Sequence, residues 1–178
     1  MKMNLRLIIC ILILIPALKT YSQELTEEES KLYKFVMEYR QQKGLGAIPI
    51  SKSLNIVAKT HVIDLFNNKP TSENCNEHSW SSKGKWSACC YTSDHAKAKC
   101  MWNKPRELTN YKGNGYEIAY WNSDDATAEN ALSGWQESPG HNAVIINKGI
   151  WKQQWNAIGL GIYKNYAVIW FGNEPDNN

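Results

Sequence analysis

A long polar stretch with no regular hydrophobic period, residues 67–112, divides this chain. It cannot present a continuous apolar face to a core, and an irregular loop of this length is uncommon in a compact domain unless it is stapled or functional. Every cysteine outside the N-terminal apolar run lies within it: Cys75, Cys89, Cys90 and Cys100. We therefore expect this stretch to be held by disulfides.

The N-terminus has the composition of an export signal. Lys2 and Arg6 precede an apolar run over residues 7–18, and small residues follow near the expected cleavage point. The run is shorter than the roughly 20 residues that span a bilayer. Residues 1–22 are therefore predicted to be a signal peptide, and the protein to be secreted or periplasmic with no transmembrane segment.

Removal of such a signal leaves an even number of cysteines, which in an exported chain predicts two disulfides. Direct pairing of Cys89 with Cys90 would require a strained ring. Each of these neighbours is therefore expected to pair with Cys75 or Cys100, in one of two orders. The spacing lacks a Cys-x-x-Cys pair, which argues against a zinc knot built from the same residues.

Two helices are predicted before the polar stretch. Thr26 and Glu29 have the spacing of a capping box, apolar residues follow at helical spacing, and Gly44 lies beyond the end. The second helix follows Ser51, and its apolar stripe includes His61. On that stripe His61 is interpreted as a buried, hydrogen-bonded core histidine in preference to a functional one.

The region after the polar stretch is predicted to begin with a strand and a helix. Residues 115–121 have the character of an extended segment, which carries Glu117 among glycines and apolar residues. Residues 126–136 are predicted to form a helix capped by Asp124 or Asp125. A hairpin closes the chain, because two alternating apolar segments flank a Lys-Asn turn at 164–165.

A Ser-Pro-Gly sequence at residues 138–140 follows the helix that contains Trp135. Proline cannot continue a helix and glycine tolerates a positive φ, so these residues are predicted to form a turn. The turn places His141 just before an apolar run at residues 144–146. An imidazole on such a corner is expected to face a cleft.

The order of helices and strands indicates an α+β fold. A length of 178 residues and a hydrophobic content of 43% suit one domain with a sizeable core, predicted over residues 23–178. The eight tryptophans and nine tyrosines fit either a core or the lining of a cleft. The net charge of +3, over scattered basic residues, argues against nucleic acid as a partner.

Five short motifs occur in order along the chain: Ala58-x-x-His61, His78-Ser79, Gly115-Tyr116-Glu117-Ile118, Trp135-x-x-Ser138-Pro139-Gly140-His141-Asn142 and Ile158-Gly159-Leu160-Gly161. This set resembles the CAP superfamily, which comprises cysteine-rich secretory proteins, antigen 5 and pathogenesis-related 1 proteins and is also called the SCP domain. The resemblance extends over about residues 32–172. It implies a three-layer α-β-α sandwich with a central, mainly antiparallel sheet.

The candidate site consists of four residues from different elements: His78, Glu117, Glu137 and His141. The resemblance implies that they share one cleft. One departure concerns Glu137, which lies two residues after Trp135, whereas eukaryotic members of the family have the second acid three residues after. Ser138 is the alternative residue at that place.

Two imidazoles and two carboxylates in one cleft have three chemical uses. First, they can bind a divalent metal such as zinc, with His78 and His141 as the predicted ligands. Second, they can act as acid and base, if burial separates their pKa values. Third, they can bind a polar ligand group without any reaction. A buried polar network that locks the loops to the sheet is the structural alternative.

The sequence favours a binding protein over an enzyme. It contains no Gly-x-Ser-x-Gly, His-Glu-x-x-His or Cys–His nucleophile pattern. Proteins of the family it resembles have been credited with lipid or sterol binding, signalling and occasionally proteolysis. The expectation is a monomeric module for a small ligand, lipid-like or polar, or for an extracellular partner; a protease-like secreted hydrolase is the alternative.

Overall fold

The computed structural model describes residues 24–177, so the predicted signal peptide lies outside the described residues. The described chain forms the following elements: α1 (Glu27–Gln42), α2 (Lys52–Asn68), α3 (Ala98–Trp102), α4 (Lys104–Leu108), β1 (Tyr116–Trp121), α5 (Ala128–Glu137), α6 (Pro139–Ile145), β2 (Ala157–Tyr163) and β3 (Tyr166–Gly172). This mixture confirms the α+β class. None of the helices in this part of the chain has both the length and the apolar run needed to span a bilayer.

The sheet is antiparallel and its strand order is β1-β3-β2. The predicted C-terminal hairpin forms β2 and β3, and Lys164 in its turn has a φ of 51°. The last strand lies in the centre, where Trp170 pairs with Glu117 on one side and with Gly159 on the other. Glu117, from the predicted extended segment, is thereby fixed in register on β1.

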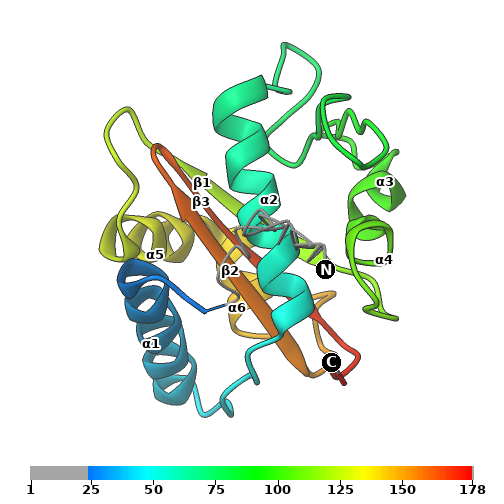
Figure 1. The fold of residues 1–178 in the computed structure, drawn as a ribbon. Helices are drawn as coiled ribbons and strands as arrows, with labels where there is room; N and C mark the ends of the chain where they lie inside the picture. The colour runs from blue at the N-terminus through cyan, green and yellow to red at the C-terminus, as the bar shows by residue number, and fades with distance from the viewer. Residues whose placement is uncertain (1–23, 178) are drawn as a thin grey trace, which may run out of the picture.

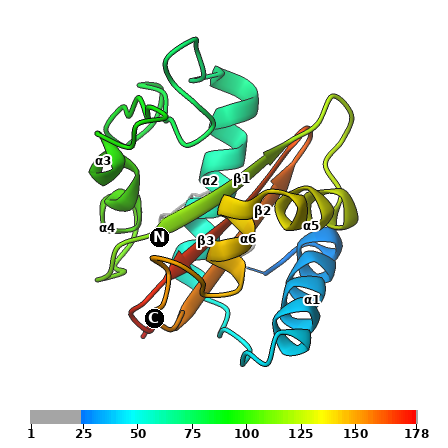
Figure 2. The same ribbon diagram turned by 180° about the vertical axis from the view of Figure 1, so that it is seen from behind.

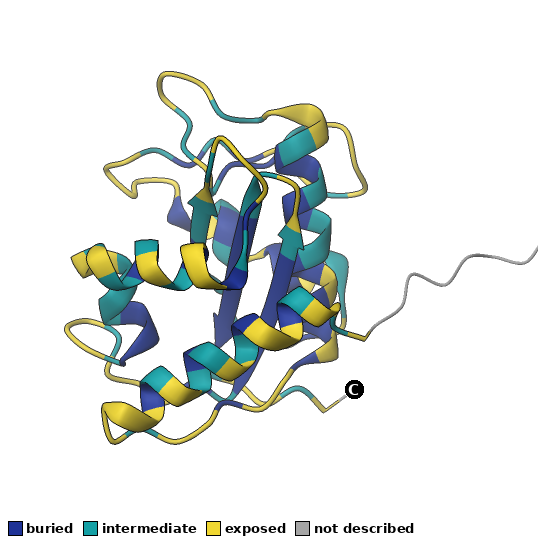
Figure 3. Ribbon diagram, turned by 90° about the vertical axis from the view of Figure 1, so that its left-hand side faces the viewer, coloured by how far each residue is buried: buried dark blue, intermediate teal, exposed yellow. Residues whose placement is uncertain are grey.

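Helices cover both faces of this sheet. α2 lies on one face and α1, α5 and α6 lie on the other (Figures 1 and 2). Toward α2 the sheet contributes Val168 and Trp170 to an apolar cluster, and toward the other helices it contributes Leu160 and Ile169. Figure 3 accordingly shows long stretches of the strands as buried between helices whose outer faces are exposed. This arrangement agrees with the predicted α-β-α layers.

Two glycines of β2 allow α2 to approach the sheet closely. A Cβ atom on Gly159 would lie 2.1 Å from the backbone carbonyl carbon of Leu54, and one on Gly161 would lie 2.6 Å from that of Ala58. A side chain at either position would therefore collide with helix backbone, which cannot move aside as a flexible side chain can. The Gly-x-Gly spacing of this motif reflects helix packing.

The helix caps confirm one prediction and correct another. At α1 the backbone N–H of Glu29 donates to the hydroxyl of Thr26, and the backbone N–H of Thr26 donates to the Glu29 carboxylate, which is the predicted capping box. At α5 the prediction of Asp124 or Asp125 was wrong. Thr127 is the N-cap, since its hydroxyl accepts from the backbone N–H of Asn130, and the helix begins two residues later than expected.

The Ser-Pro-Gly sequence does not form the predicted turn. The helix breaks at Ser138, as expected, but α6 begins immediately with Pro139 in its first turn. Proline is tolerated there because the first backbone N–H groups of a helix have no intrahelical acceptor. Gly140 is not among the residues with a positive φ. His141 therefore projects from the first turn of a helix.

The polar stretch is less irregular than its sequence indicates, because it contains α3 and α4. Helices of five residues are too short to show a hydrophobic period, so the pattern could not predict them. Both lie on the side of the molecule opposite α1 and α5 (Figures 1 and 2). Two disulfides hold the stretch, Cys75–Cys90 and Cys89–Cys100, which resolves the two pairings that the sequence left open.

Candidate functional site

A cavity of about 480 Å³ lies where the disulfide-bonded stretch meets β1 and α6. It is lined by His78, Tyr91, His95, Ala98, Met101, Trp102, Tyr116, Glu117, Ile118, Gly140, His141, Val144, Ile150 and Trp151. Three of the four predicted site residues are in this set. The volume is within the range of small-molecule sites, most of which are largely apolar with a few placed polar groups.

Glu117 is the centre of the polar end of the cavity. Its side chain is fully buried, and each carboxylate oxygen faces one imidazole. Oε1 lies 2.5 Å from Nδ1 of His61, and Oε2 lies 2.8 Å from Nδ1 of His78. Burial alone raises the pKa of the Glu117 carboxyl, but the charges and hydrogen bonds of the two histidines outweigh it and leave that pKa below its ordinary value.

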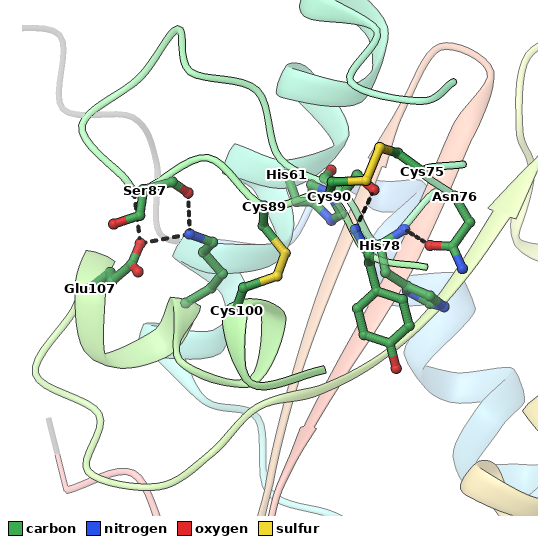
Figure 4. The surroundings of a disulfide bond; sticks show 12 residues. His61, Cys75, Asn76, His78, Ser87, Cys89, Cys90, Cys100 and Glu107 are labelled. Carbon is green, nitrogen blue, oxygen red and sulfur yellow. Dashed lines mark hydrogen bonds and ion pairs between the residues drawn. A yellow bond between two sulfur atoms is a disulfide. The ribbon is translucent and has the colours of Figure 1, made fainter. Parts of the chain in front are cut away.

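His78 is placed by the stapled chain around it. The backbone N–H of His78 donates to the side-chain oxygen of Asn76. The backbone N–H of Asn76 in turn donates to the backbone carbonyl of Tyr91. Cys75 and Cys90 join the same two segments covalently, as Figure 4 shows. The loop that carries His78 is thus fixed by a disulfide and short polar contacts, without an extended apolar core of its own.

His141 enters the same cavity from α6. It is partly buried, and burial together with the neighbouring His78 lowers the pKa of its imidazole, while Glu117 and Glu77 act in the opposite direction. The His141 ring is therefore close enough to His78 and Glu117 for their charges to affect its pKa. His78, Glu117 and His141 are therefore brought together at one cavity.

Glu137, the fourth predicted residue, is not brought to the cavity. It is exposed at the end of α5, where its carboxylate accepts a hydrogen bond from Ser133, one helical turn earlier. Ser138, the alternative, is the N-cap of α6 and is not among the lining residues either. The two-histidine, two-carboxylate set is thus reduced to two histidines and one carboxylate.

Aromatic side chains form the wall next to the polar end. The ring of Tyr116 lies 5.5 Å from that of Trp102 and 5.3 Å from that of Trp151, measured between centroids. Behind them Trp155 is buried and contacts both Tyr116 and Trp151. The abundant aromatics of the sequence therefore serve both predicted purposes, because some fill the core and others line the cleft.

Sequence reasoning missed two parts of the site. His61 was predicted to be a buried core histidine, which is confirmed, but it also contacts Glu117 directly. His95 was not among the predicted site residues; it is exposed, yet it lines the cavity and its Nδ1 lies 2.9 Å from the hydroxyl of Tyr91. Its left-handed backbone, with a φ of 59°, is unusual for a residue other than glycine and could not be read from the sequence.

The side chains at the cavity provide few ligands for a metal ion. Among residues 24–177 no group of three or more His, Cys, Asp or Glu side chains is placed to hold one. His78 and His141 supply two imidazoles, whereas catalytic zinc has three protein ligands as a rule. His78 has also committed Nδ1 to Glu117. The residues therefore fit at most a weak, two-ligand site.

Comparison with known proteins gives a family and a fold. The cysteine-rich secretory protein family, CAP, matches residues 33–170. No curated protein matches the chain. Among solved structures, an outer surface protein from Borrelia burgdorferi is similar with a TM-score of 0.55 and 20% identity, over 85% of this chain and 96% of that one.

Two further solved structures are similar over part of their length. One is an extracellular protein containing an SCP domain from Bacillus anthracis, with a TM-score of 0.59 and 17% identity, over 86% of this chain and 45% of that one. The other is a cysteine-rich secretory protein from Staphylococcus aureus, with a TM-score of 0.52 and 15% identity, over 83% and 39%. At these identities the likeness establishes the fold alone.

Proposed function

The chain belongs to the cysteine-rich secretory protein (CAP) family, and from that premise we propose that it is an extracytoplasmic binding module for a small amphipathic ligand. The ligand's apolar part would lie against the aromatic wall, and its single polar group would meet His78 and His141 beside Glu117. The observation that carries this proposal is the cavity itself, which joins an apolar wall to one compact polar end.

The location outside the cytoplasm is supported by three features. The N-terminal sequence has the composition of an export signal. Both disulfides are of the kind that persist in oxidising compartments. One structural relative is described as extracellular and another as secretory. The ligand would accordingly be met outside the cell or in the periplasm.

The hydrolase alternative is less well supported by the contacts around the cleft. Ser79 follows His78, but its hydroxyl is buried and accepts a hydrogen bond from the backbone N–H of Tyr91. All four cysteines of the described chain are in disulfides. A nucleophile beside a base is the usual signature of covalent catalysis; the Ser79 hydroxyl is engaged by Tyr91, and the four described cysteines have no free thiol.

The test uses N-phenyl-1-naphthylamine, a neutral fluorescent probe with an aromatic body and one polar N–H group. We expect saturable binding to the oxidised protein, weakened about tenfold or more in Trp151→Ala, because a tryptophan wall contributes well over 1.4 kcal/mol to such a contact. Trp121→Ala is the matched control, since Trp121 is 55% exposed at the end of β1 and does not line the cavity. Equal weakening in both variants, or no saturable binding, would contradict the proposal.

Metal assistance is tested separately, with zinc alone. Calorimetry at about pH 7.5 should give at most a weak heat, which should become weaker at about pH 5.5 because protonated imidazole cannot ligate. The heat should vanish in His141→Ala. Tight binding, or heat unchanged by that substitution, would show that the ion is held by other residues.

A further inference from the structure

His61 is a buried residue that touches the candidate site without lining it. Its side chain has no exposed surface, it comes from the middle of α2, and it is not among the residues that line the cavity. Nδ1 lies 2.5 Å from Oε1 of Glu117, and Nε2 lies 2.9 Å from the backbone carbonyl oxygen of Ser79. Both ring nitrogens are therefore engaged by oxygen atoms.

The hydrogen-bonding capacity of these atoms fixes where the protons lie. The Ser79 carbonyl can only accept, so Nε2 of His61 must carry a hydrogen. A carboxylate oxygen also accepts, so one more proton must lie between Nδ1 of His61 and Oε1 of Glu117. It resides on His61, giving an imidazolium, or on Oε1. In either arrangement the second carboxyl oxygen, Oε2, has no hydrogen and remains an acceptor.

The acceptor role of Oε2 fixes the direction of its hydrogen bond with His78. Because Oε2 accepts, Nδ1 of His78, at 2.8 Å, must donate to it. A neutral His78 then carries its only ring hydrogen on Nδ1. We infer that His61 is a positioning residue: through Glu117 it fixes the tautomer of His78, so that Nε2 is the ring nitrogen with a free lone pair at the cavity.

Packing holds His61 in the required orientation. Its ring stacks on Trp80 at a centroid distance of 4.2 Å and an interplanar angle of 5°. The ammonium group of the buried Lys104 lies 5.5 Å from the centroid of Trp80. The imidazole plane therefore cannot rotate without losing the stack and both hydrogen bonds. An aromatic face also favours a positively charged imidazole, which suits the ion-paired arrangement.

This inference deepens the proposed function, on which its ligand assignment rests. Each carboxylate oxygen of Glu117 already faces a histidine and the side chain is fully buried, so Glu117 offers a ligand little accessible surface. His78 would present an acceptor through Nε2. The polar group that the cleft recognises would therefore be a hydrogen-bond donor, such as a hydroxyl or an amide N–H, in preference to a carboxylate.

The tautomer can be measured directly by NMR on oxidised protein labelled with ¹⁵N at histidine. Long-range ¹H–¹⁵N correlations distinguish protonated from unprotonated ring nitrogens, and the chain has only four histidines, assigned by single substitutions. In the wild type at about pH 7.5, above the ordinary histidine pKa of about 6.5, we expect His78 with a hydrogen on Nδ1 and none on Nε2. A hydrogen on Nε2 of neutral His78 would overturn the inference, whether or not the probe binds.

Two variants test whether His61 determines the tautomer of His78. His61→Phe keeps a ring against Trp80 but removes the donor to Oε1 of Glu117. Burial then favours a proton on Glu117 itself, and a protonated Oε2 can donate to Nδ1 of His78, so His78 should become a mixture of tautomers. His61→Gln retains an amide N–H donor and should keep the wild-type pattern. His95→Gln is the control, because His95 lines the cavity without contacting Glu117 and should leave the His78 signals in place. A wild-type pattern in His61→Phe, or its loss in folded His61→Gln, would contradict the inference.

Near-UV circular dichroism of the tryptophans establishes that each variant is folded. If His61→Phe fails to fold, the wild-type and His61→Gln spectra still decide the outcome. A merely structural role for His61 would change stability but would not select one tautomer of a residue on another segment.

Discussion

The sheet with its covering helices and the segment from Cys75 to Cys100 are held together by different means. The first has two apolar clusters, and its central strand β3 is almost wholly buried. The second contributes Trp80, Cys89, Tyr91 and Ala98 to one of those clusters, and is otherwise held by two disulfides and by polar contacts such as that between Asn76 and His78. The cavity lies where the two regions meet, so a rigid sheet supplies Glu117 and a stapled loop supplies His78.

The comparison suggests a division of roles. Packing in the sheet region tolerates little change, because interiors are close-packed and backbone contacts cannot relax. Away from its four buried apolar residues, the disulfide-bonded segment can present varied side chains, since the disulfides hold its backbone. Perturbing the first should therefore affect the whole fold, and perturbing the second should affect mainly the cleft.

The largest effect is expected at Gly159. In Gly159→Ala the new Cβ would meet the backbone of Leu54 at 2.1 Å, so α2 must move away from the sheet. We expect a loss of about 3 kcal/mol or more in the free energy of unfolding, measured with urea. Gly46→Ala is the control, because nothing lies within 4 Å of a Cβ there. Similar losses in both variants would refute the close-packing argument.

Removal of the Cys75–Cys90 disulfide should have the next largest effect. The Cys75→Ala, Cys90→Ala double variant opens a loop with a sequence separation of 15, for which the chain-entropy model gives about 3 kcal/mol. We expect the far-UV circular dichroism of the helices and sheet to survive and probe binding in the cleft to be lost. Retention of wild-type binding would show that the polar contacts alone position His78.

A smaller effect is expected at the start of α5. Thr127→Ala removes the hydroxyl that accepts from the backbone N–H of Asn130, and should cost about 1 kcal/mol of unfolding free energy. Asp125→Ala removes no cap and should change the stability by less than about 0.5 kcal/mol. The reverse order of the two losses, measured by thermal or urea unfolding, would restore Asp125 as the cap.

The smallest effect concerns the pH dependence contributed by His141. Its pKa is lowered in the folded protein, by burial first, so the unfolded chain binds a proton there at a higher pH than the folded chain does. Stability from this residue is therefore complete above the ordinary pKa of about 6.5 and falls as the pH drops toward the folded value. In His141→Gln, urea unfolding should show a shallower fall between about pH 7.5 and about pH 5.5. An unchanged slope would contradict the shift.

The sequence predicted the parts of the molecule that local patterns determine. The capping box at Thr26, the hairpin around Lys164 and the extended segment with Glu117 all depend on residues close together in the chain. The convergence of His78, Glu117 and His141 was predicted from motif order, and the structure places all three at one cavity.

What could not be predicted depends on contacts between distant residues or on elements too short to have a period. The contact of His61 with Glu117 joins residues 56 positions apart, and only the approach of α2 to the sheet creates it. The apolar stripe shows that His61 is buried but not what it meets. Glu137 lies exposed at the end of α5, and a helix boundary predicted from sequence is too uncertain to show which way a terminal side chain points.

The neighbouring cysteines also affect how the protein must mature. The mispaired form, Cys75–Cys89 with Cys90–Cys100, would close rings each only one residue shorter than the native ones. Loop entropy would distinguish the two forms by only about 0.1 kcal/mol, so it cannot select the native pairing. Selection must come from noncovalent structure, such as the backbone bridge between Trp80 and Cys89. If oxidation is faster than formation of this bridge, an isomer is trapped, and the yield of correctly paired protein then depends on thiol exchange.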